Sequence, residues 1–564
     1  MGKNLKLESK KVWLIAIKMI VALSGTYLSL VFNAYGQGYF VSAFNENTTM
    51  AFFFVCLLGG FVLAGLIVIL FKLDFLEKLY DRLLKKPKPA RIILVIYSLI
   101  CGFFYVSRFN HHVTERIIHH GETLWTPLPP LWALVLPLAL MYVFFLTVLI
   151  DFVVGLFKSF SRYELVFFVV FTVIAISYID VLYNSTDVYH KHFSGNGFMY
   201  SYDTLPDAIY LLDPFYIWSY YQYPLQPNFA MPLLLFTIPL SRFDGFWEVI
   251  VRQIVQVELL LLAIIALSRM VSKNIRVRII ALLIFSFSYP NVILAMIVER
   301  RLFALVFLVL AIYHNIYLRG VEKNKGEDAL WLSVASGMIV TNVYVFLLAI
   351  EPVRAGVNIK NWLKSTLKNV FLYSSVFVFI TTFFGKIGGL VDLRAQVNAF
   401  NDYGWLFNDY SFGTRLTHFM YFIASCLFPA PSGIRPATGN QWWQTEPSME
   451  SPYFWLGIII SAFAVLGFIL NYKNRFAQVS FAGILMSTYF ILMSSLNIGE
   501  NAVVLSTLFY SWAVISLIIM GIDKLFVGTK AKTRVLAGLA GVCLVWSVIE
   551  AVRLYQFGLE IHPV

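Results

Sequence analysis

Residues 131–156 read LWALVLPLALMYVFFLTVLIDFVVGL, and Asp151 is the single charged side chain in this stretch. Such an apolar run exceeds the roughly 20 residues that cross the hydrocarbon core of a bilayer as an α-helix. Its apolar residues are continuous and do not alternate with polar ones, which argues against a membrane β-barrel. The stretch therefore predicts a membrane-spanning helix.

The same pattern recurs along the chain. Of its 564 residues, 59% are hydrophobic and 13% are charged, and a soluble protein of this size could not cover its surface with so few charges. The sequence predicts an all-α polytopic membrane protein with about 13 to 15 transmembrane helices. We expect spans near residues 12–33, 51–71, 92–107, 131–156, 163–183, 247–268, 279–297, 302–318, 367–387, 454–471, 477–495, 501–520 and 535–555.

Lysine and arginine gather in short clusters between the apolar runs and give the chain a net charge of +12. Because basic loops of membrane proteins face the cytoplasm, we expect a multi-pass protein of a bacterial inner or plasma membrane with a cytoplasmic N-terminus. This explanation of the charge implies no nucleic-acid partner. The clusters lie at residues 1–11, 72–91, 157–162, 269–278, 319–325, 354–368, 472–475 and 523–534.

One apolar region, residues 329–360, lies between two basic clusters. If both clusters are cytoplasmic, this region must enter the membrane and return on the same side. The polar pair Thr341 and Asn342 is a natural apex for two short helices. The alternative is a single span followed by a basic outer loop.

The longest expected outer loop, residues 184–246, contains YYQYPLQPNFAMPLLL at residues 220–235. Its prolines prevent one continuous helix, and its tyrosine and tryptophan side chains favour the membrane interface. We therefore expect short juxtamembrane helices along the outer surface. Further outer loops are expected at residues 108–130, 388–415 and 429–453.

Three segments resemble GT-C-fold glycosyltransferases in their layout. The first is an acidic outer loop that leads through the proline motif YPLQPNFAMPL, residues 223–233, into the next span. The second is ASGMIVTNVYVFLLAIEP, residues 335–352, which is similar to the glycine-then-polar membrane hairpin of that fold. The third is FSYPNVILAMIVERRLFALVFLVLAIY, residues 287–313, where a proline-broken outer end carries Glu299 and Arg300.

The resemblance covers about residues 163–390 and implies a GT-C-like core. Residues 1–162 would then be an N-terminal accessory module, and residues 391–564 would add C-terminal transmembrane helices. GT-C enzymes transfer a sugar from a polyprenyl-phosphate carrier on the outer face of the membrane. The resemblance thus implies a hexosyl- or pentosyltransferase whose partners are the bilayer, a polyprenyl-phosphate-linked sugar and a cell-envelope glycan or lipid acceptor.

Asp180 and Asp187 are the candidate catalytic bases. An inverting transferase needs a carboxylate that accepts the proton of the attacking hydroxyl. Many members of the family carry two adjacent acids early in the first outer loop, whereas the adjacent acidic pair here is Glu327–Asp328, in a lysine-rich loop. Asp180 or Asp187 would serve instead. Helix capping or loop solvation is the alternative role for both aspartates.

Several arginines lie at expected outer ends of spans, against the usual bias towards the cytoplasm. Guanidinium groups bind phosphate oxygens in pairs, so these residues could hold the departing carrier phosphate. Ion pairs within the loops or contacts with lipid head groups would explain them equally well. The candidate substrate- and phosphate-binding residues are His190, Arg242, Arg252, Glu299, Arg300, Arg394 and Arg415.

A divalent metal ion is a further candidate cofactor. In the loop HHVTERIIHHGE, helical spacing would place His112, Glu115 and His119 on one face, and imidazole with carboxylate is a set of zinc ligands. The alternative is the solvated polar face of a surface helix.

Two other classes of function remain open. One is a polysaccharide polymerase or ligase of the O-antigen type, and the other is a non-catalytic lipid or solute transporter. A transporter should carry ionisable residues near the middle of its spans. The expected spans are nearly free of charge at their centres, with Glu258 as an exception, which favours chemistry at the surface.

Overall fold

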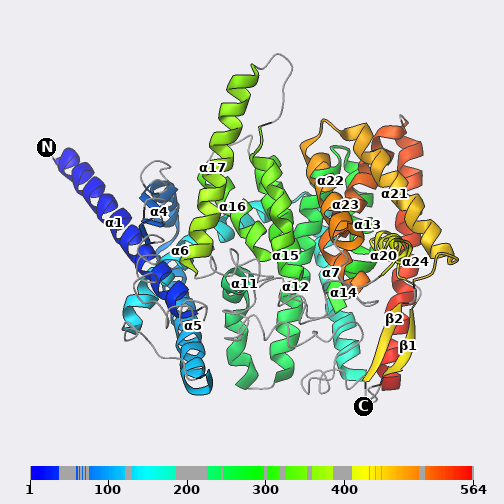
Figure 1. The fold of residues 1–564 in the computed structure, drawn as a ribbon, viewed down its shortest axis with the longest axis horizontal. Helices are drawn as coiled ribbons and strands as arrows, with labels where there is room; N and C mark the ends of the chain where they lie inside the picture. Colours follow the sequence, from blue (N-terminus) through cyan, green and yellow to red (C-terminus); the bar gives the residue numbers. More distant parts are fainter. Residues whose placement is uncertain are drawn as a thin grey trace.

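The computed structural model describes most of the chain as helices (Figure 1). Within the described residues, eight helices are long and apolar enough to cross a membrane, which confirms an all-α polytopic membrane protein. The described residues are 2–36, 59–60, 62–63, 66–67, 70, 75–120, 130–185, 225–242, 245–296, 301–317, 325–351, 358–384, 410–430, 432–437, 440–445, 447–493, 502–526 and 528–561.

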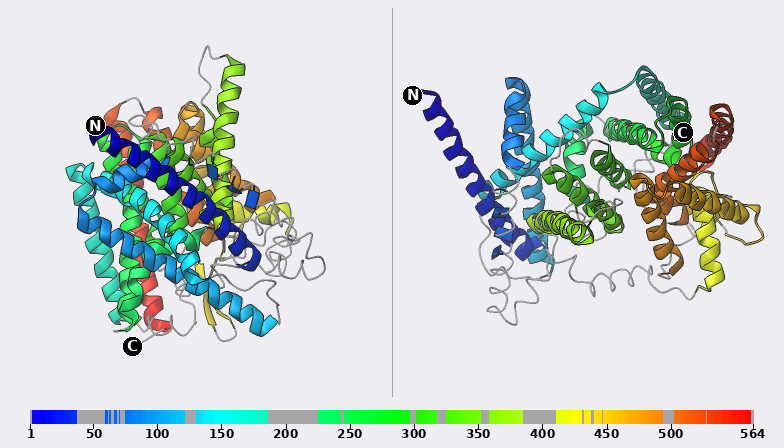
Figure 2. Two further views of the ribbon diagram at one scale, coloured as in Figure 1. Left: turned by 90° about the vertical axis from the view of Figure 1, so that its left-hand side faces the viewer. Right: turned by 90° about the horizontal axis from the view of Figure 1, so that it is seen from above.

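The first part of the chain supplies α1 (Gly2–Gly36), α4 (Phe75–Lys85), α5 (Lys88–His120), α6 (Leu131–Lys158) and α7 (Arg162–Ser185). Helices α5 and α6 pack closely at Gly102. A Cβ atom on this residue would lie only 2.9 Å from the carbonyl oxygen of Val135. In Figure 2, α1 and α5 lie at one end of the molecule and the C-terminal helices lie at the other.

The middle part forms α11 (Gln226–Leu234), η1 (Leu235–Arg242), α12 (Gly245–Val271), α13 (Ile275–Ser286), α14 (Tyr289–Met296), α15 (Arg301–Ile316), α16 (Lys325–Met338), η3 (Val340–Ala349) and α17 (Ile359–Phe383). The C-terminal part forms α20 (Phe412–Ser425), β1 (Ser432–Ala437), β2 (Asn440–Thr445), α21 (Pro452–Asn471), α22 (Arg475–Thr488), η4 (Tyr489–Met493), α23 (Ala502–Leu525) and α24 (Thr529–Ile561). The strands β1 and β2 pair antiparallel, in a segment for which the sequence predicts a loop.

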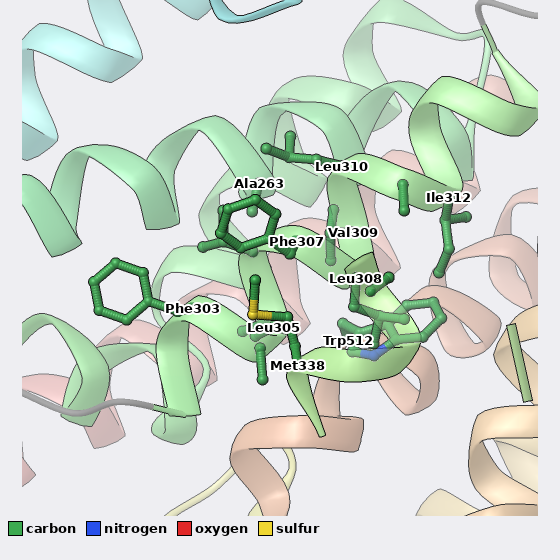
Figure 3. Packing of buried hydrophobic residues seen from close by; sticks show 14 of the residues in the cluster. Ala263, Phe303, Leu305, Phe307, Leu308, Val309, Leu310, Ile312, Met338 and Trp512 are labelled. Atoms are coloured by element: carbon green, nitrogen blue, oxygen red, sulfur yellow. The ribbon is translucent and has the colours of Figure 1, made fainter. Parts of the chain in front are cut away.

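Helix α15 forms the centre of the core. Its residues from Leu302 to Tyr313 are all buried, as expected for a helix that is apolar on every side. Figure 3 shows its side chains together with Ala263 of α12, Met338 of α16 and Trp512 of α23.

The basic clusters at residues 72–91, 269–278 and 523–534 lie at one end of the helices, which we call the basic face. There the hydroxyl group of Ser272, after α12, donates a hydrogen bond to Asp523 of α23 at 2.7 Å. Ion pairs join further elements at this face, so clusters far apart in the sequence share it. These pairs are Arg82–Glu327, Lys86–Asp151, Arg269–Glu164 and Lys532–Asp523.

The region from 329 to 350 forms two short helices, α16 and η3, as the sequence predicts, but the break lies at Ile339, and Thr341 and Asn342 lie within η3. The Asn342 side chain donates a hydrogen bond back to the carbonyl oxygen of Ala335 at 3.2 Å. After η3, the Glu351 carboxylate accepts a hydrogen bond from Asn369 of α17 at 2.7 Å. The carbonyl groups at the end of η3 accept hydrogen bonds from Arg475, at the start of α22 in one of the basic clusters.

The proline segment does not lie on the surface, so the expectation of juxtamembrane helices is wrong for residues 225–235. Helix α11 is buried along its length, and the Leu225 amide donates a hydrogen bond to the carbonyl oxygen of Gly337 at 2.7 Å. The side chain of Asn228 donates to the Tyr105 hydroxyl group at 2.8 Å. Tyr97 donates to the carbonyl oxygen of Pro232 at 2.6 Å. Broken helices are stable inside membrane proteins when neighbouring side chains satisfy their backbone in this way.

Candidate functional site

Asp180, one of the two predicted bases, lies near the end of α7, five residues before its last residue, and is exposed. Its carboxylate accepts a hydrogen bond from the side chain of Asn184 at 2.8 Å. The residues that follow α7, including the predicted base Asp187 and the predicted ligand His190, lie outside the described residues.

Arg252, a predicted phosphate ligand, is buried near the start of α12 and is 2% exposed. Its Nε atom donates a hydrogen bond to the Thr237 hydroxyl group of η1 at 2.9 Å. The adjacent Gln253 donates to the carbonyl oxygen of Ala295 in α14 at 3.0 Å. Buried guanidinium groups are costly and mark functional or paired positions inside membrane segments, so among the predicted phosphate ligands this arginine is the strongest described candidate.

Asp180 and Arg252 lie at the same level on two antiparallel helices. Near the basic face, Glu164 of α7 pairs with Arg269 of α12 at 2.8 Å. With a rise of 1.5 Å per residue, Asp180 lies about 24 Å further along α7 and Arg252 about 26 Å further along α12. Both residues therefore lie towards the face opposite the basic face.

Of the remaining predicted phosphate ligands, the structure describes the side chain of Arg415. Arg415 of α20 donates a hydrogen bond from Nη1 to the carbonyl oxygen of Leu492 in η4 at 3.1 Å. Arg242 is the last residue of η1, and its side chain lies outside the description. Glu299, Arg300 and Arg394 also lie outside the described residues.

The predicted metal ligands share α5. His112 is buried, at 7% exposed, while the side chains of Glu115 and His119 are outside the description. Among the described residues, no group of three histidine, cysteine, aspartate or glutamate side chains is placed to hold a metal ion. The metal site at His112, Glu115 and His119 therefore stays a prediction.

Sequence reasoning missed a buried ionic cluster at the basic face. Its centre is the Glu164 carboxylate, whose side chain is 1% exposed. Arg269 donates to it from Nε and from Nη2, each at 2.8 Å, and Arg278 of α13 donates from Nη2. Arg269 also donates to the Ser159 hydroxyl group at 2.8 Å and to the Tyr313 hydroxyl group at 3.1 Å.

A local signal for this cluster exists in the residues SRYE, 161–164. The Ser161 amide and hydroxyl group both donate to the Glu164 carboxylate at 2.8 Å. Serine before a helix and glutamate three residues later form a capping box, which predicts the start of α7 but not the two arginines. No protein-family model, curated protein or solved structure matches this chain.

Proposed function

We propose that the chain is a GT-C-like membrane glycosyltransferase, which transfers a sugar from a polyprenyl-phosphate carrier to a cell-envelope glycan or lipid acceptor. The reaction would take place at the face opposite the basic face, and this face would be the outer one. The observation that carries the proposal is the buried Arg252, at the level of the exposed Asp180 on the neighbouring antiparallel helix.

In this proposal, Asp180 accepts the proton of the acceptor hydroxyl group while the hydroxyl oxygen attacks the anomeric carbon of the sugar. The bond from that carbon to the carrier phosphate breaks, and the polyprenyl phosphate leaves with its electron pair. Arg252 stabilises the charge that develops on the departing phosphate. The Thr237 hydroxyl group accepts a hydrogen bond from the guanidinium group at 2.9 Å, so Arg252 is oriented before the substrate binds.

Complementation of a deletion strain in the native host tests this proposal. Deletion should remove one sugar from the surface glycans or lipids and cause a polyprenyl-phosphate-linked sugar to accumulate. The wild-type gene and the exposed-site control Arg276→Gln should restore the surface sugar, whereas Arg252→Gln should not, at equal amounts of protein in the membrane. Unchanged glycans and carrier lipids in the deletion strain would contradict the proposal.

A second candidate function, a transporter, is favoured by the interrupted helices at the centre of the protein. Helix α11 begins against the last turn of α16, where the Leu225 amide binds the Gly337 carbonyl group. Asn228 and Asn342 are fully buried near these helix ends, and their side-chain oxygens accept no hydrogen bond. Transporters place substrate sites at such broken helices. A transporter would move its substrate across the membrane without changing it covalently.

A further inference from the structure

A cleft of ≈ 420 Å³ opens at the basic face, between the ends of α6, α7, α12, α13 and α15. It lies at the other end of α7 from Asp180, about 24 Å away along the helix, and is therefore separate from the proposed transfer site. Its polar lining includes Asp151, Ser159, Ser161, Glu164, Arg269 and Arg278.

The charge of this cleft is positive on balance. Arg269 and Arg278 face the single carboxylate of Glu164, while Asp151 is neutralised by Lys86. The exposed cations Lys158, Arg162, Lys273 and Arg276 lie in the same segments as the lining residues. Charges of one sign around a concave surface attract the opposite ion, so the cleft favours an anion.

Arg278 offers the anion an unused hydrogen-bond donor. Its Nη2 atom binds Glu164 and its guanidinium carbon lies 5.8 Å from the centre of the Tyr163 ring. Its Nε atom is buried and makes no hydrogen bond. Unpaired buried donors are rare in proteins, and guanidinium groups match the oxygens of phosphate.

The cleft also has space for a ligand. A Cβ atom added to Gly155 of α6 would meet nothing within 4 Å. At the rim, Tyr317 is 50% exposed, and its ring stacks on that of Tyr313 with centroids 5.0 Å apart. A ligand can therefore reach the arginines from outside the protein.

We propose that this cleft binds a phosphate group, carried either by an anionic lipid head group of the adjoining leaflet or by a small phosphorylated solute. Arg278 is the direct ligand. The Ser161 amide and hydroxyl group fix the Glu164 carboxylate, and this carboxylate accepts hydrogen bonds from Arg269 and Arg278. The two arginines are therefore oriented before the ligand binds.

Binding to the purified full-length chain tests this proposal with two probes. Native mass spectrometry counts retained phosphatidylglycerol against phosphatidylcholine, and a thermal shift measures stabilisation by inorganic phosphate. Retention of phosphatidylglycerol assigns the site to a lipid head group, whereas stabilisation by inorganic phosphate alone assigns it to a solute. In either case, Gly155→Leu should weaken binding about tenfold or more, because leucine fills the cleft without changing its charges and keeps the phosphate from Arg278. A hydrogen bond to a charged group contributes about 1.5–3 kcal/mol.

Matched variants separate the cleft from general effects. Arg278→Gln should weaken binding as much as Gly155→Leu, whereas Lys360→Gln, which removes an exposed cation of α17 outside the cleft, should not. Gly541→Leu is the control for Gly155→Leu, because a Cβ atom on Gly541 of α24 also meets nothing within 4 Å. The proposal is wrong if neither probe binds, if Gly155→Leu binds as the wild type does, or if the two controls lose binding equally.

Discussion

Replacement of Glu164 by glutamine should strongly destabilise the protein. The carboxylate accepts five hydrogen bonds, two from Arg269, two from Ser161 and one from Arg278. Glutamine keeps the shape of the side chain but leaves two largely buried guanidinium groups without a counter-charge. Loss of one partner from a buried ion pair costs about 3–5 kcal/mol. The ratio of folded to unfolded protein should therefore fall by roughly a hundredfold to a few thousandfold.

Unfolding of the detergent-solubilised chain by dodecyl sulfate measures this loss directly. The control is Glu450→Gln, which also removes one carboxylate, because Glu450 lies exposed just before α21. Exposed charges contribute at most about 1 kcal/mol. If Glu164→Gln unfolds at the same dodecyl sulfate fraction as Glu450→Gln, the cluster at the basic face does not hold α7, α12 and α13 together as we infer.

Two further predictions concern topology and packing. A cysteine at exposed Glu450, just before α21, should react with a membrane-impermeant reagent on intact cells. A cysteine at exposed Lys473, just after α21, should react only after lysis, and the reverse pattern would invert the proposed orientation. Gly337→Val should destabilise the protein by about 1–3 kcal/mol, because a Cβ atom there would lie 2.2 Å from Leu225 Cδ1. The control is Gly541→Val, where a Cβ atom meets nothing within 4 Å. If both variants unfold alike, α11 does not pack on α16.

The membrane-spanning character of the chain was predictable because it depends on local composition. Residues 131–156 contain enough continuous apolar sequence to specify α6, which the structure places at Leu131–Lys158. A break in residues 329–350 was also predictable, since basic clusters flank the region, but its position at Ile339 was not, because the polar residues Thr341 and Asn342 lie within η3. For α6 the signal lies within the segment, whereas for α16 and η3 it lies in the flanking residues.

The place of α11 could not be predicted from its own residues. Prolines and aromatic side chains are equally suited to a helix on the membrane surface and to a broken helix inside the protein. The choice depends on Tyr97, Tyr105 and Gly337, which lie more than 100 residues away in sequence and supply its hydrogen-bond partners.

The ionic cluster was hidden for the same reason. The capping box at Ser161 and Glu164 is local, but Arg269 and Arg278 reach Glu164 across separations of 105 and 114 residues. In the sequence these arginines are part of a basic cluster whose charge the orientation rule already explains. Only the packing of α7 against α12 and α13 shows that they are paired.

The most direct test of the proposed function uses carrier lipids extracted from the deletion strain, because these should contain the natural sugar donor. The wild-type chain in proteoliposomes, supplied with an envelope glycan extract as acceptor, should release free polyprenyl phosphate from them. Asp180→Asn should insert normally but release it about a hundredfold to ten-thousandfold more slowly. Carrier lipids that stay unchanged, or that cross the bilayer with their sugar still attached, would contradict the glycosyltransferase proposal.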